Sequence, residues 1–380
     1  MASASATIPV GYKQTEIGEA PGDWEVKLIG EIAQVIGGGT PSTQVSNYWG
    51  GEINWFTPTE VGSTKYVFES MRKITNSGFQ NSSCSLLPVG TILLTSRAGI
   101  GDLGILRNPS CTNQGFQSLV CNENVKNEFL YYIMLTKRPE LERRGSGSTF
   151  LEIKPSEVKS MPILLPSMEE QNIISRALSD IDTQIQALEL LISKKRDIKQ
   201  GTMQGLLTRK LRLPGFSGEW DVKSLGQIGE ITGAGVDKKI IEGETPVRLV
   251  NYLDVYNRSF IYSDELDHHV TAPPSKAIKC SVRKGDVFFT PTSEVRDDIA
   301  VSAIAMENIP DGTYSYHVVR LRIRDDWDLN YRAYAFQTKA FLDQAAVLSD
   351  GSGTRYVISL PNFRKLKVLV PSKREQQAIG

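Results

Sequence analysis

The sequence predicts an α+β protein in which two similar mixed α/β domains are separated by a long coiled-coil helix. Two observations predict this architecture. One is an internal repeat with an offset near 196 residues, and the other is a heptad pattern of apolar residues between the two copies. An offset of this size is too long for a solenoid and fits two copies of one domain. The 380 residues are enough for two hydrophobic cores.

The repeat begins at a tryptophan motif. Pro21–Lys27 (PGDWEVK) returns as Ser217–Lys223 (SGEWDVK). The pairs that continue at the same offset are Gly30 with Gly226, Ile32 with Ile228, Val35 with Ile231, Gly37 with Gly233, and Gly39 with Gly235. Because these matches keep their order and spacing, we interpret the two regions as related domains and not as a chance likeness between short apolar strands.

The copies also agree further along the chain. The later matches are Pro88–Thr95 with Arg283–Thr290, Gly145–Ser148 with Gly351–Thr354, Met161–Pro166 with Leu366–Pro371, and Glu170-Gln171 with Glu375-Gln376. Within each copy, short β-rich runs alternate with Gly, Pro, Asn and Ser, which favours strands joined by turns. Helical stretches are expected near 127–143 and 329–347. Each copy is therefore predicted to be a mixed α+β domain.

The segment between the copies has a different pattern. From Ser167 to Arg209 it is almost free of Gly and Pro until Gly201. Its apolar residues step by four and three, which is a heptad seam: Ile174, Leu178, Ile181, Ile185, Leu188 and Ile192. Ser167 followed by Glu170 forms a capping box that predicts where the helix begins. A helix of roughly 40 residues would reach about 60 Å. The alternative, a core helix of an ordinary domain, agrees less well with this length and position.

We therefore divide the chain into four segments. The first domain with its N-terminal arm is 1–166, the central helix is 167–213, the second domain is 214–370, and 371–380 begins a truncated distal helix. An exposed heptad seam needs a partner helix. Three alternatives stay open: the given chain is cut short, the natural chain is shortened, or another subunit completes the seam.

Composition excludes several classes of protein. Forty-three basic residues balance forty-three acidic ones, so any nucleic-acid contact must rely on local clusters of charge. The four cysteines have no C-x-x-C spacing, and the three histidines do not lie at metal-ligand intervals beside them, so no metal site is expected. Residues 1–7 lack the pattern of a secretion signal, and no apolar run approaches the roughly 18 residues of a membrane span. We expect a cytoplasmic protein that does not contact a membrane.

Several motifs resemble one known family. They are Gly11–Gly18 (GYKQTEIG) leading into Pro21–Val26, Gly38–Ser42 (GGTPS), Tyr48–Trp55 with Thr57-Pro58, Lys199–Gln204 (KQGTMQ), and Leu206–Lys210 running into Arg212–Phe216. Together with the duplicated architecture, they make the chain similar to the specificity subunit of type I restriction-modification systems. The resemblance covers nearly the whole chain, and the missing distal helix is a departure from the family pattern.

The resemblance implies a function. Each copy would be a target-recognition domain that docks into the major groove, so that the chain binds double-stranded DNA and reads a bipartite target, one half-site per domain. The helices would form an antiparallel pair that sets the distance between half-sites. Expected partners are two methyltransferase subunits and restriction/translocase subunits. S-adenosylmethionine, ATP and Mg would be bound by those partners, and none of these cofactors by this chain.

The candidate DNA-contacting residues are polar side chains on loops that follow apolar strands. Base edges are read by paired donors and acceptors, and Arg, Asn, Gln, Ser and Thr supply them. The first copy offers Thr40, Ser42, Thr57, Thr59, Ser96, Arg97, Asn113 and Gln114. The second copy offers Arg248, Asn251, Tyr252, Thr292, Ser293, Arg296, Arg355 and Tyr356. The alternative for each of these residues is ordinary turn chemistry, because turns need the same residue types.

A local cluster of charge lies at the end of the central segment. Seven basic residues against Asp197 leave a surplus of six: Lys194, Lys195, Arg196, Lys199, Arg209, Lys210 and Arg212. This cluster would face the DNA between the half-sites, cover an acidic partner, or form a solvated helix face.

No sequence motif indicates an enzyme. The chain has no phosphate-binding loop, no H-E-x-x-H motif and no Asn-Pro-Pro-aromatic motif of an amino-methylating enzyme, and no catalytic residue is predicted. Three alternatives to the specificity subunit are kept. The chain would be the detached recognition part of a fused restriction-methylation enzyme, a tandem module that binds a ligand other than nucleic acid, or, as the weakest alternative, an enzyme whose site has no known motif.

Overall fold

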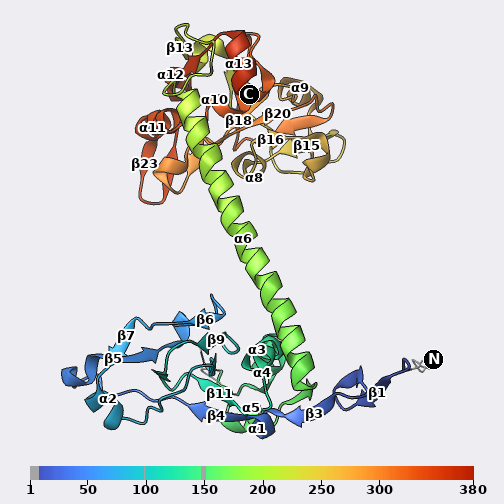
Figure 1. Cartoon of the computed structure of the whole chain (residues 1–380). Helices are drawn as coiled ribbons and strands as arrows, with labels where there is room; N and C mark the ends of the chain where they lie inside the picture. Colours follow the sequence, from blue (N-terminus) through green and yellow to red (C-terminus); the bar gives the residue numbers. More distant parts are fainter. Residues whose placement is uncertain (1–7, 98, 147–150) are drawn as a thin grey trace. The chain divides into compact units, whose positions relative to one another are not determined.

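The computed structural model describes residues 8–97, 99–146 and 151–380. The N-terminal stretch 1–7, Ala98 in the predicted loop 96–99, and residues 147 and 148 of the predicted Gly-Ser match lie outside these described residues. The chain divides into two compact units, Met1–Leu188 and Glu189–Gly380. The division falls inside the long helix α6 (Met168–Leu207), which Figure 1 draws as one continuous coil.

The first unit contains a mixed five-stranded sheet in the order β4-β11-β8-β9-β6. Beside it lie a three-stranded sheet, β10-β5-β7, and the pairs β12-β3 and β1-β2. The strands are β1 (Tyr12–Thr15), β2 (Gly18–Pro21), β3 (Glu25–Leu28), β4 (Ala33–Gly37), β5 (Trp49–Phe56), β6 (Tyr66–Val67), β7 (Arg72–Ile74), β8 (Ile92–Leu94), β9 (Leu103–Leu106), β10 (Ser110–Thr112), β11 (Gln117–Cys121) and β12 (Pro162–Leu165). The helices before α6 are α1 (Ile29–Ile32), η1 (Ser46–Tyr48), η2 (Pro58–Glu60), α2 (Asn76–Gln80), α3 (Asn127–Thr136), α4 (Arg138–Arg144) and α5 (Pro155–Lys159).

The second unit repeats the five-stranded sheet, the three-stranded sheet and the β12-β3 pair of this topology, and it adds a second three-stranded sheet, β19-β24-β23. Its five-stranded sheet has the order β14-β22-β18-β20-β16, its three-stranded sheet is β17-β15-β21, and β13 pairs with β25. The strands are β13 (Asp221–Ser224), β14 (Gly229–Thr232), β15 (Thr245–Val250), β16 (Phe260–Ile261), β17 (His269–Ala272), β18 (Asp286–Phe289), β19 (Thr292–Ser293), β20 (Ser302–Ala305), β21 (Gly312–Tyr314), β22 (Val319–Ile323), β23 (Asp350–Ser352), β24 (Arg355–Val357) and β25 (Lys367–Val370). The helices after α6 are α7 (Leu225–Ile228), α8 (Tyr252–Tyr256), η3 (Ser263–Glu265), α9 (Pro274–Lys279), η4 (Arg296–Asp298), α10 (Leu329–Ala335), α11 (Lys339–Leu348), α12 (Leu360–Lys365) and α13 (Lys373–Ile379).

The predicted fold class is confirmed, and the repeat explains why the two sheets match. The central strands β8 and β18 are buried along their whole length, because Ile92–Leu94 and Val287–Phe289 face apolar layers on both sides. Continuous apolar runs of this kind are typical of strands covered on both faces. The expected helical stretches near 127–143 and 329–347 are the helix pairs α3-α4 and α10-α11.

In the first unit, α6 begins at a buried polar anchor. Ser167 Oγ accepts the backbone N–H of Glu170 at 3.3 Å, which is the N-cap half of the predicted capping box. The Glu170 carboxylate accepts the indole N–H of Trp24 at 3.0 Å. Gln171 is 1% exposed; its amide nitrogen donates to the carbonyls of Asn124 and Pro166, and its oxygen accepts the N–H of Lys126. The first turn of the helix is thereby tied to the domain.

The same anchor recurs in the second unit at α13. Ser372 Oγ accepts the N–H of Glu375 at 3.3 Å, and Glu375 accepts the indole N–H of Trp220 at 2.9 Å. Gln376 donates to the Pro371 carbonyl and accepts the N–H of Asp328. The helix α13 therefore begins with the same contacts as α6.

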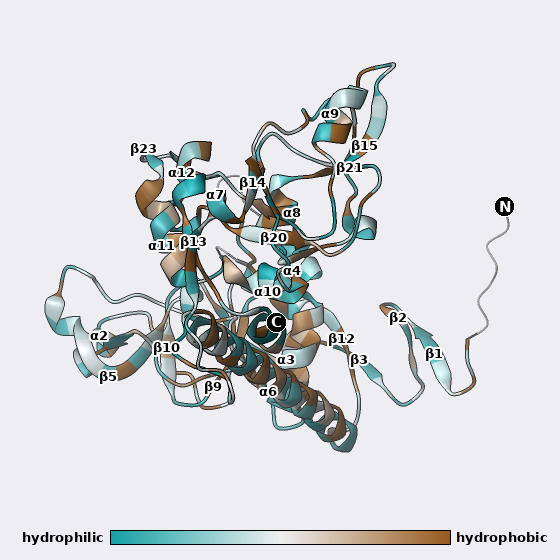
Figure 2. Ribbon diagram, turned by 90° about the horizontal axis from the view of Figure 1, so that it is seen from above, coloured by the Kyte–Doolittle hydropathy of each residue, from teal (hydrophilic) through white to brown (hydrophobic). Residues whose placement is uncertain are grey.

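The middle of α6 carries the predicted heptad seam on an open surface. Ile181, Ile185, Leu188 and Ile192 are 49–57% exposed. Figure 2 shows hydrophobic residues interleaved with hydrophilic ones along this helix. On the N-terminal side, Tyr132 and Lys65 hold the helix through Asp182 and Ser179. α6 ends at Leu207, within the predicted range 167–213, and the Leu211 N–H then donates back to the Gly205 carbonyl.

All four cysteines are free thiols. Among the helices of the described residues, none has the length and apolar character that crossing a bilayer requires.

The helix anchor predicts a specific loss of stability. Gln171→Ala should lower the free energy of unfolding of the first unit by about 2–3 kcal/mol, because buried backbone groups lose their hydrogen-bond partners. Urea unfolding followed by circular dichroism and tryptophan fluorescence measures this change. The control is Gln186→Ala, an exposed glutamine of the same helix, for which we expect a change within about 0.5 kcal/mol. Equal effects of the two substitutions would contradict the anchor.

Candidate functional site

A polar hollow lies at the ends of three strands in the first unit. Its volume is about 540 Å³. It is formed by η2, which follows β5, by the loop after β8, and by the loop between β10 and β11. The lining residues are Pro58, Thr59, Val61, Arg97, Asp102, Asn113, Gln114 and Gly115. Four predicted residues, Thr59, Arg97, Asn113 and Gln114, therefore come together here from three separate parts of the sequence.

The segment after β5 is held by a capping box. Glu60 accepts both the N–H of Thr57 at 2.8 Å and its hydroxyl at 2.7 Å. Its other carboxylate oxygen accepts the N–H of Met71 at 2.6 Å. Thr57 is thus a half-buried capping residue, whereas Thr59 is exposed on the lip of the hollow.

The loop between β10 and β11 is an Asx turn. The Asn113 side-chain oxygen accepts the N–H of Gly115 at 2.9 Å, which leaves Gln114 exposed at the tip. The Thr40 hydroxyl donates to the Gln114 side-chain oxygen. Gly38 permits this approach, since a Cβ there would lie 2.0 Å from the Asn113 carbonyl oxygen. Thr40 therefore belongs to the same surface. Ser42 is exposed nearby, and its carbonyl accepts the indole N–H of Trp49.

Ser96 and Arg97 have opposite environments although they are neighbours in sequence. Ser96 is completely buried, so its side chain is not available for the surface contact expected from the sequence. Its carbonyl accepts the N–H of Ile153. Arg97 lines the hollow and forms an ion pair with Glu152, with 2.8 Å between Nη2 and Oε1.

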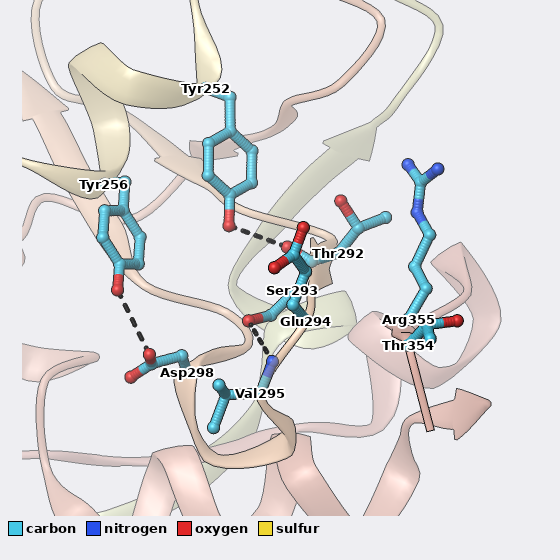
Figure 3. A pocket seen from close by; sticks show the side chains of 9 residues that line it. All are labelled: Tyr252, Tyr256, Thr292, Ser293, Glu294, Val295, Asp298, Thr354 and Arg355. Atoms are coloured by element: carbon cyan, nitrogen blue, oxygen red, sulfur yellow. Dashed lines mark hydrogen bonds between the residues drawn. The ribbon is translucent and has the colours of Figure 1, made fainter. Parts of the chain in front are cut away.

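A second hollow lies in the second unit, with a volume of about 420 Å³. Figure 3 shows its nine lining residues: Tyr252, Tyr256, Thr292, Ser293, Glu294, Val295, Asp298, Thr354 and Arg355. Four of the predicted residues, Tyr252, Thr292, Ser293 and Arg355, are among them. The charged residues of this lining are Glu294, Asp298 and Arg355, so it carries one negative charge more than positive charges. In the first hollow, Arg97 and Asp102 balance each other.

The two tyrosines form one wall of the second hollow. Their rings stack at 5.8 Å with planes 17° apart. The Tyr252 hydroxyl donates to the Thr292 carbonyl at 2.9 Å, and the Tyr256 hydroxyl donates to Asp298 at 3.1 Å (Figure 3). Burial raises the pKa of Tyr252, and the hydrogen bond to Asp298 raises the pKa of Tyr256. Both hydroxyls therefore stay protonated at neutral pH and act as donors.

Arg296 and Tyr356 lie beside the second hollow but do not line it. The Arg296 guanidinium lies 5.5 Å from the centre of the Tyr356 ring and donates to the Ser349 carbonyl at 3.3 Å. This contact joins the loop after β18 to the hairpin of β23 and β24.

Arg248 and Asn251, which were predicted to contact DNA, form contacts within the second unit. Arg248 forms a two-pronged ion pair with Asp311 and also donates to the Ser263 carbonyl. The hydrogen bond to Asp311 raises the pKa of Arg248, and the same bond lowers the pKa of Asp311. Asn251 is the N-cap residue of α8, and its N–H donates to Asp254 at 2.8 Å. Neither side chain lines the second hollow. The Arg248 guanidinium is already paired with Asp311.

The two hollows occupy the same place in the repeated topology. Both follow the central strand of the five-stranded sheet, β8 or β18, and both include the helical turn after β5 or β15. The strand-to-helix turns are alike, because Thr57 with Glu60 and Asn251 with Asp254 are capping boxes at matching positions. One frame therefore presents two different sets of side chains.

Sequence reasoning missed several residues of these surfaces. They are Asp102 and Glu152 in the first unit and Tyr256 and Asp298 in the second. The capping box of Asn251 and Asp254 is a sequence signal for the helix α8, whose last residue is Tyr256. Glu152 has no such signal, because it meets Arg97 only through the bridge between two distant segments.

The predicted basic cluster is partly neutralised within the second unit. Arg209 pairs with Glu219, and Arg212 pairs with Glu375 at 2.8 Å. Lys194, Lys195 and Arg196 are exposed on α6. Within the described ranges, no group of three or more His, Cys, Asp or Glu side chains is arranged to hold a metal ion.

These features define a class of protein: a duplicated α/β domain in which each copy presents a polar hollow, with a long helix linking the copies. Residues 21–194 match the family described as type I restriction modification DNA specificity domain. The chain is 35% identical over 280 residues to the type I restriction enzyme MjaIX specificity subunit of Methanocaldococcus jannaschii. The alignment covers 73% of this chain and 54% of the relative. It is 26% identical over 196 residues to the EcoR124I/EcoR124II specificity subunit of Escherichia coli, covering 50% and 48% of the two chains.

The fold has solved counterparts. The crystal structure of a type I restriction-modification S subunit from M. genitalium superimposes with a TM-score of 0.54 at 14% identity, covering 94% of this chain and 87% of that one. The matched region spans about half the length of the curated relatives. This chain is a relative of the type I restriction-modification specificity subunits and carries their DNA specificity domain.

The internal pairing of Arg248 leads to a prediction. Arg248→Ala should lower the free energy of unfolding of the second unit by about 1 kcal/mol, a small value because Asp311 is half exposed and water screens the pair. Arg355→Ala, in the open hollow, should leave stability within about 0.5 kcal/mol of the original chain. Urea unfolding of both variants measures the difference. A larger loss for Arg355→Ala would contradict these assignments.

Proposed function

We propose that this chain is a sequence-specific DNA-binding specificity subunit of a type I restriction-modification complex. It has no catalytic role of its own, and it reads a bipartite target with one half-site for each domain. The observation that carries the proposal is the pair of hollows, which lie at matching places in two copies of one fold and are lined by different polar side chains. Two domains that recognise different DNA sequences need the same fold but different hydrogen-bond donors and acceptors on the contact surface.

The contact residues proposed for the first half-site are Thr40, Ser42, Thr57, Thr59, Arg97, Asn113 and Gln114. Those for the second are Tyr252, Thr292, Ser293, Arg296, Arg355 and Tyr356. Arginine recognises guanine, and asparagine or glutamine recognises adenine, through paired hydrogen bonds in the major groove. The exposure of Gln114 and Arg355 supports such contacts, whereas Ser96, Arg248 and Asn251 are left out for the reasons given above.

The proposed organisation follows the segments 1–166, 167–213, 214–370 and 371–380. The two domains are the target-recognition domains, and the central helix is the spacer. The open seam of α6 supports a helical partner, since apolar residues at heptad spacing pack against another helix. The proposed partners are two methyltransferase subunits and the restriction/translocase subunits, which would bind S-adenosylmethionine, ATP and Mg, in the cytoplasm.

The proposal is tested by selecting duplexes from a random DNA library with the full chain and sequencing those that bind. Two separated conserved blocks are the expected result. Binding that falls steeply with added salt on all duplexes, without conserved blocks, would show phosphate contact alone. No duplex binding at all would favour the module for another ligand. Sequencing methylated positions in a host that expresses the chain with separate methyltransferase genes distinguishes a subunit from the detached part of a fused enzyme.

A single substitution tests direct reading in the first hollow. Arg97→Ala should weaken binding to the selected duplex by about 1–3 kcal/mol, the usual contribution of an arginine-guanine contact. The measurement is fluorescence anisotropy on the selected duplex and on a scrambled one. Equal weakening on both duplexes would instead identify Arg97 as a phosphate contact.

An exchange of domains tests the two-reader arrangement. Replacing residues 22–165 with the corresponding domain of a relative should change one half of the selected sequence and leave the other half unchanged, because each domain contacts its own half-site. Selection and sequencing with the chimaera give the result. A change in both halves, or in neither, would contradict the proposal.

A further inference from the structure

The ion pair between Arg97 and Glu152 joins two segments of the first unit that are distant in sequence. The two residues face each other across an antiparallel bridge. The backbone of Glu152 is fixed by two hydrogen bonds with Ser146, at 2.9 and 3.0 Å. The next residue, Ile153, is buried and donates to the Ser96 carbonyl at 3.1 Å. Backbone hydrogen bonds therefore anchor Glu152 and Ser96, the residue that precedes Arg97.

The pair itself is open to solvent. The side chain of Arg97 is 42% exposed and that of Glu152 is 37% exposed. Ion pairs with this exposure contribute little to stability, because water screens them and two long side chains lose freedom. The fold therefore does not need this pair. Its position points to a ligand, because Arg97 lines the hollow with Thr59, Asn113 and Gln114.

We infer that Arg97 and Glu152 together read one G·C base pair, with Arg97 donating to guanine and Glu152 accepting from cytosine. This inference rests on the proposed function and adds Glu152 as a specificity-determining residue. In the major groove, guanine presents the acceptors O6 and N7, and cytosine presents the N4 amino group as a donor. The O6 and N4 atoms of one pair lie about 2.9 Å apart, at hydrogen-bond distance. The guanidinium donor and the carboxylate acceptor lie 2.8 Å apart, which matches that order and spacing.

The same arrangement disfavours the other base pairs, although a T·A pair is disfavoured least. Thymine O4 and adenine N6 keep the order of guanine O6 and cytosine N4, but the thymine methyl group takes the place of N7, so the guanidinium loses one acceptor. At an A·T pair, the guanidinium would meet the N6 donor of adenine, and the carboxylate would meet the O4 acceptor of thymine. At a reversed pair, the guanidinium would meet the cytosine amino group and the carboxylate would meet guanine O6. Each of these contacts places like groups together, and such repulsion is a source of specificity.

The second unit provides an internal comparison. The positions that match Arg97 and Glu152 in the repeated bridge are Thr292 and Val357, which pair between β19 and β24. Neither of these residues is charged, so the second hollow cannot read a base pair in this way. The inference therefore concerns only the half-site of the first domain.

The first experiment compares selected sequences for the full chain and for Glu152→Gln. Glutamine keeps the shape of the side chain, but its amide donates as well as accepts, so the carboxylate's preference for the cytosine amino group is lost. We expect one G·C position in the first half-site to lose about tenfold in preference, while the second half-site stays unchanged. The matched control is Glu25→Gln, which removes an exposed carboxylate paired with Lys27 at 2.9 Å on β3 and should leave both half-sites unchanged.

The second experiment measures the contact itself. The selected duplex is prepared with 2-pyrimidinone, which lacks the amino group, in place of the cytosine, or with 7-deazaguanine, which lacks N7. Binding of the original chain, Glu152→Gln and Arg97→Ala to each duplex forms double-mutant cycles, in which the altered stability of the duplex cancels. We expect Glu152 to couple to the amino group and Arg97 to couple to N7, each by about tenfold.

The outcomes distinguish a failure of the inference about Glu152 from a failure of the proposed function. If the original chain selects two conserved blocks but Glu152→Gln selects the same G·C position with the same preference, the inference is wrong and the proposed function stands. Equal weakening of Glu152→Gln on all duplexes, or the absence of coupling to 2-pyrimidinone, would also overturn the inference. If the original chain selects no sequence, the proposed function itself fails. Thermal melting of each variant confirms that it is folded.

Discussion

The structure depends on one buried polar contact that occurs twice. A glutamine at the start of a helix, Gln171 or Gln376, satisfies backbone groups that would otherwise be buried without partners. Next to it, a glutamate accepts the indole N–H of Trp24 or Trp220. Because an unsatisfied buried group costs more than a hydrogen bond contributes, the helix has one low-energy place to begin. This constraint fixes each helix start to its own domain.

The surface formed by the residues that follow β8 and β18 differs between the two copies. The strands β8 and β18 are buried, and apart from Asp286, which pairs with Arg322, their residues are apolar. The residues that follow them are not limited in this way, so Arg97 in one copy corresponds to Thr292 in the other. The result is an amide-rich lining with one arginine and one aspartate in the first hollow and an aromatic, acidic lining in the second. A duplicated fold can thereby carry two different recognition surfaces.

Sequence patterns predicted the architecture better than the individual contacts. The helix α6 follows from the step of apolar residues between Ile174 and Ile192, which is a local property of the chain. The predicted loops did gather into hollows, since residues after parallel or neighbouring strands meet at one sheet edge. The roles of Ser96, Arg248 and Asn251 were not predictable in the same way. Each depends on a partner far away in sequence or on a local cap, such as Asp311 for Arg248.

By itself, the sequence determined the duplication, the long helix and the polar composition of the loops. Periodicity and repeated motifs record these features directly, because helices and strands form from residues close together in the chain. Only the tertiary structure decided which loop residues face the hollows and which are buried or paired inside. The ion pair of Arg97 and Glu152 shows the reason: it joins residues 55 positions apart, and their meeting depends on how the sheet brings the two segments together.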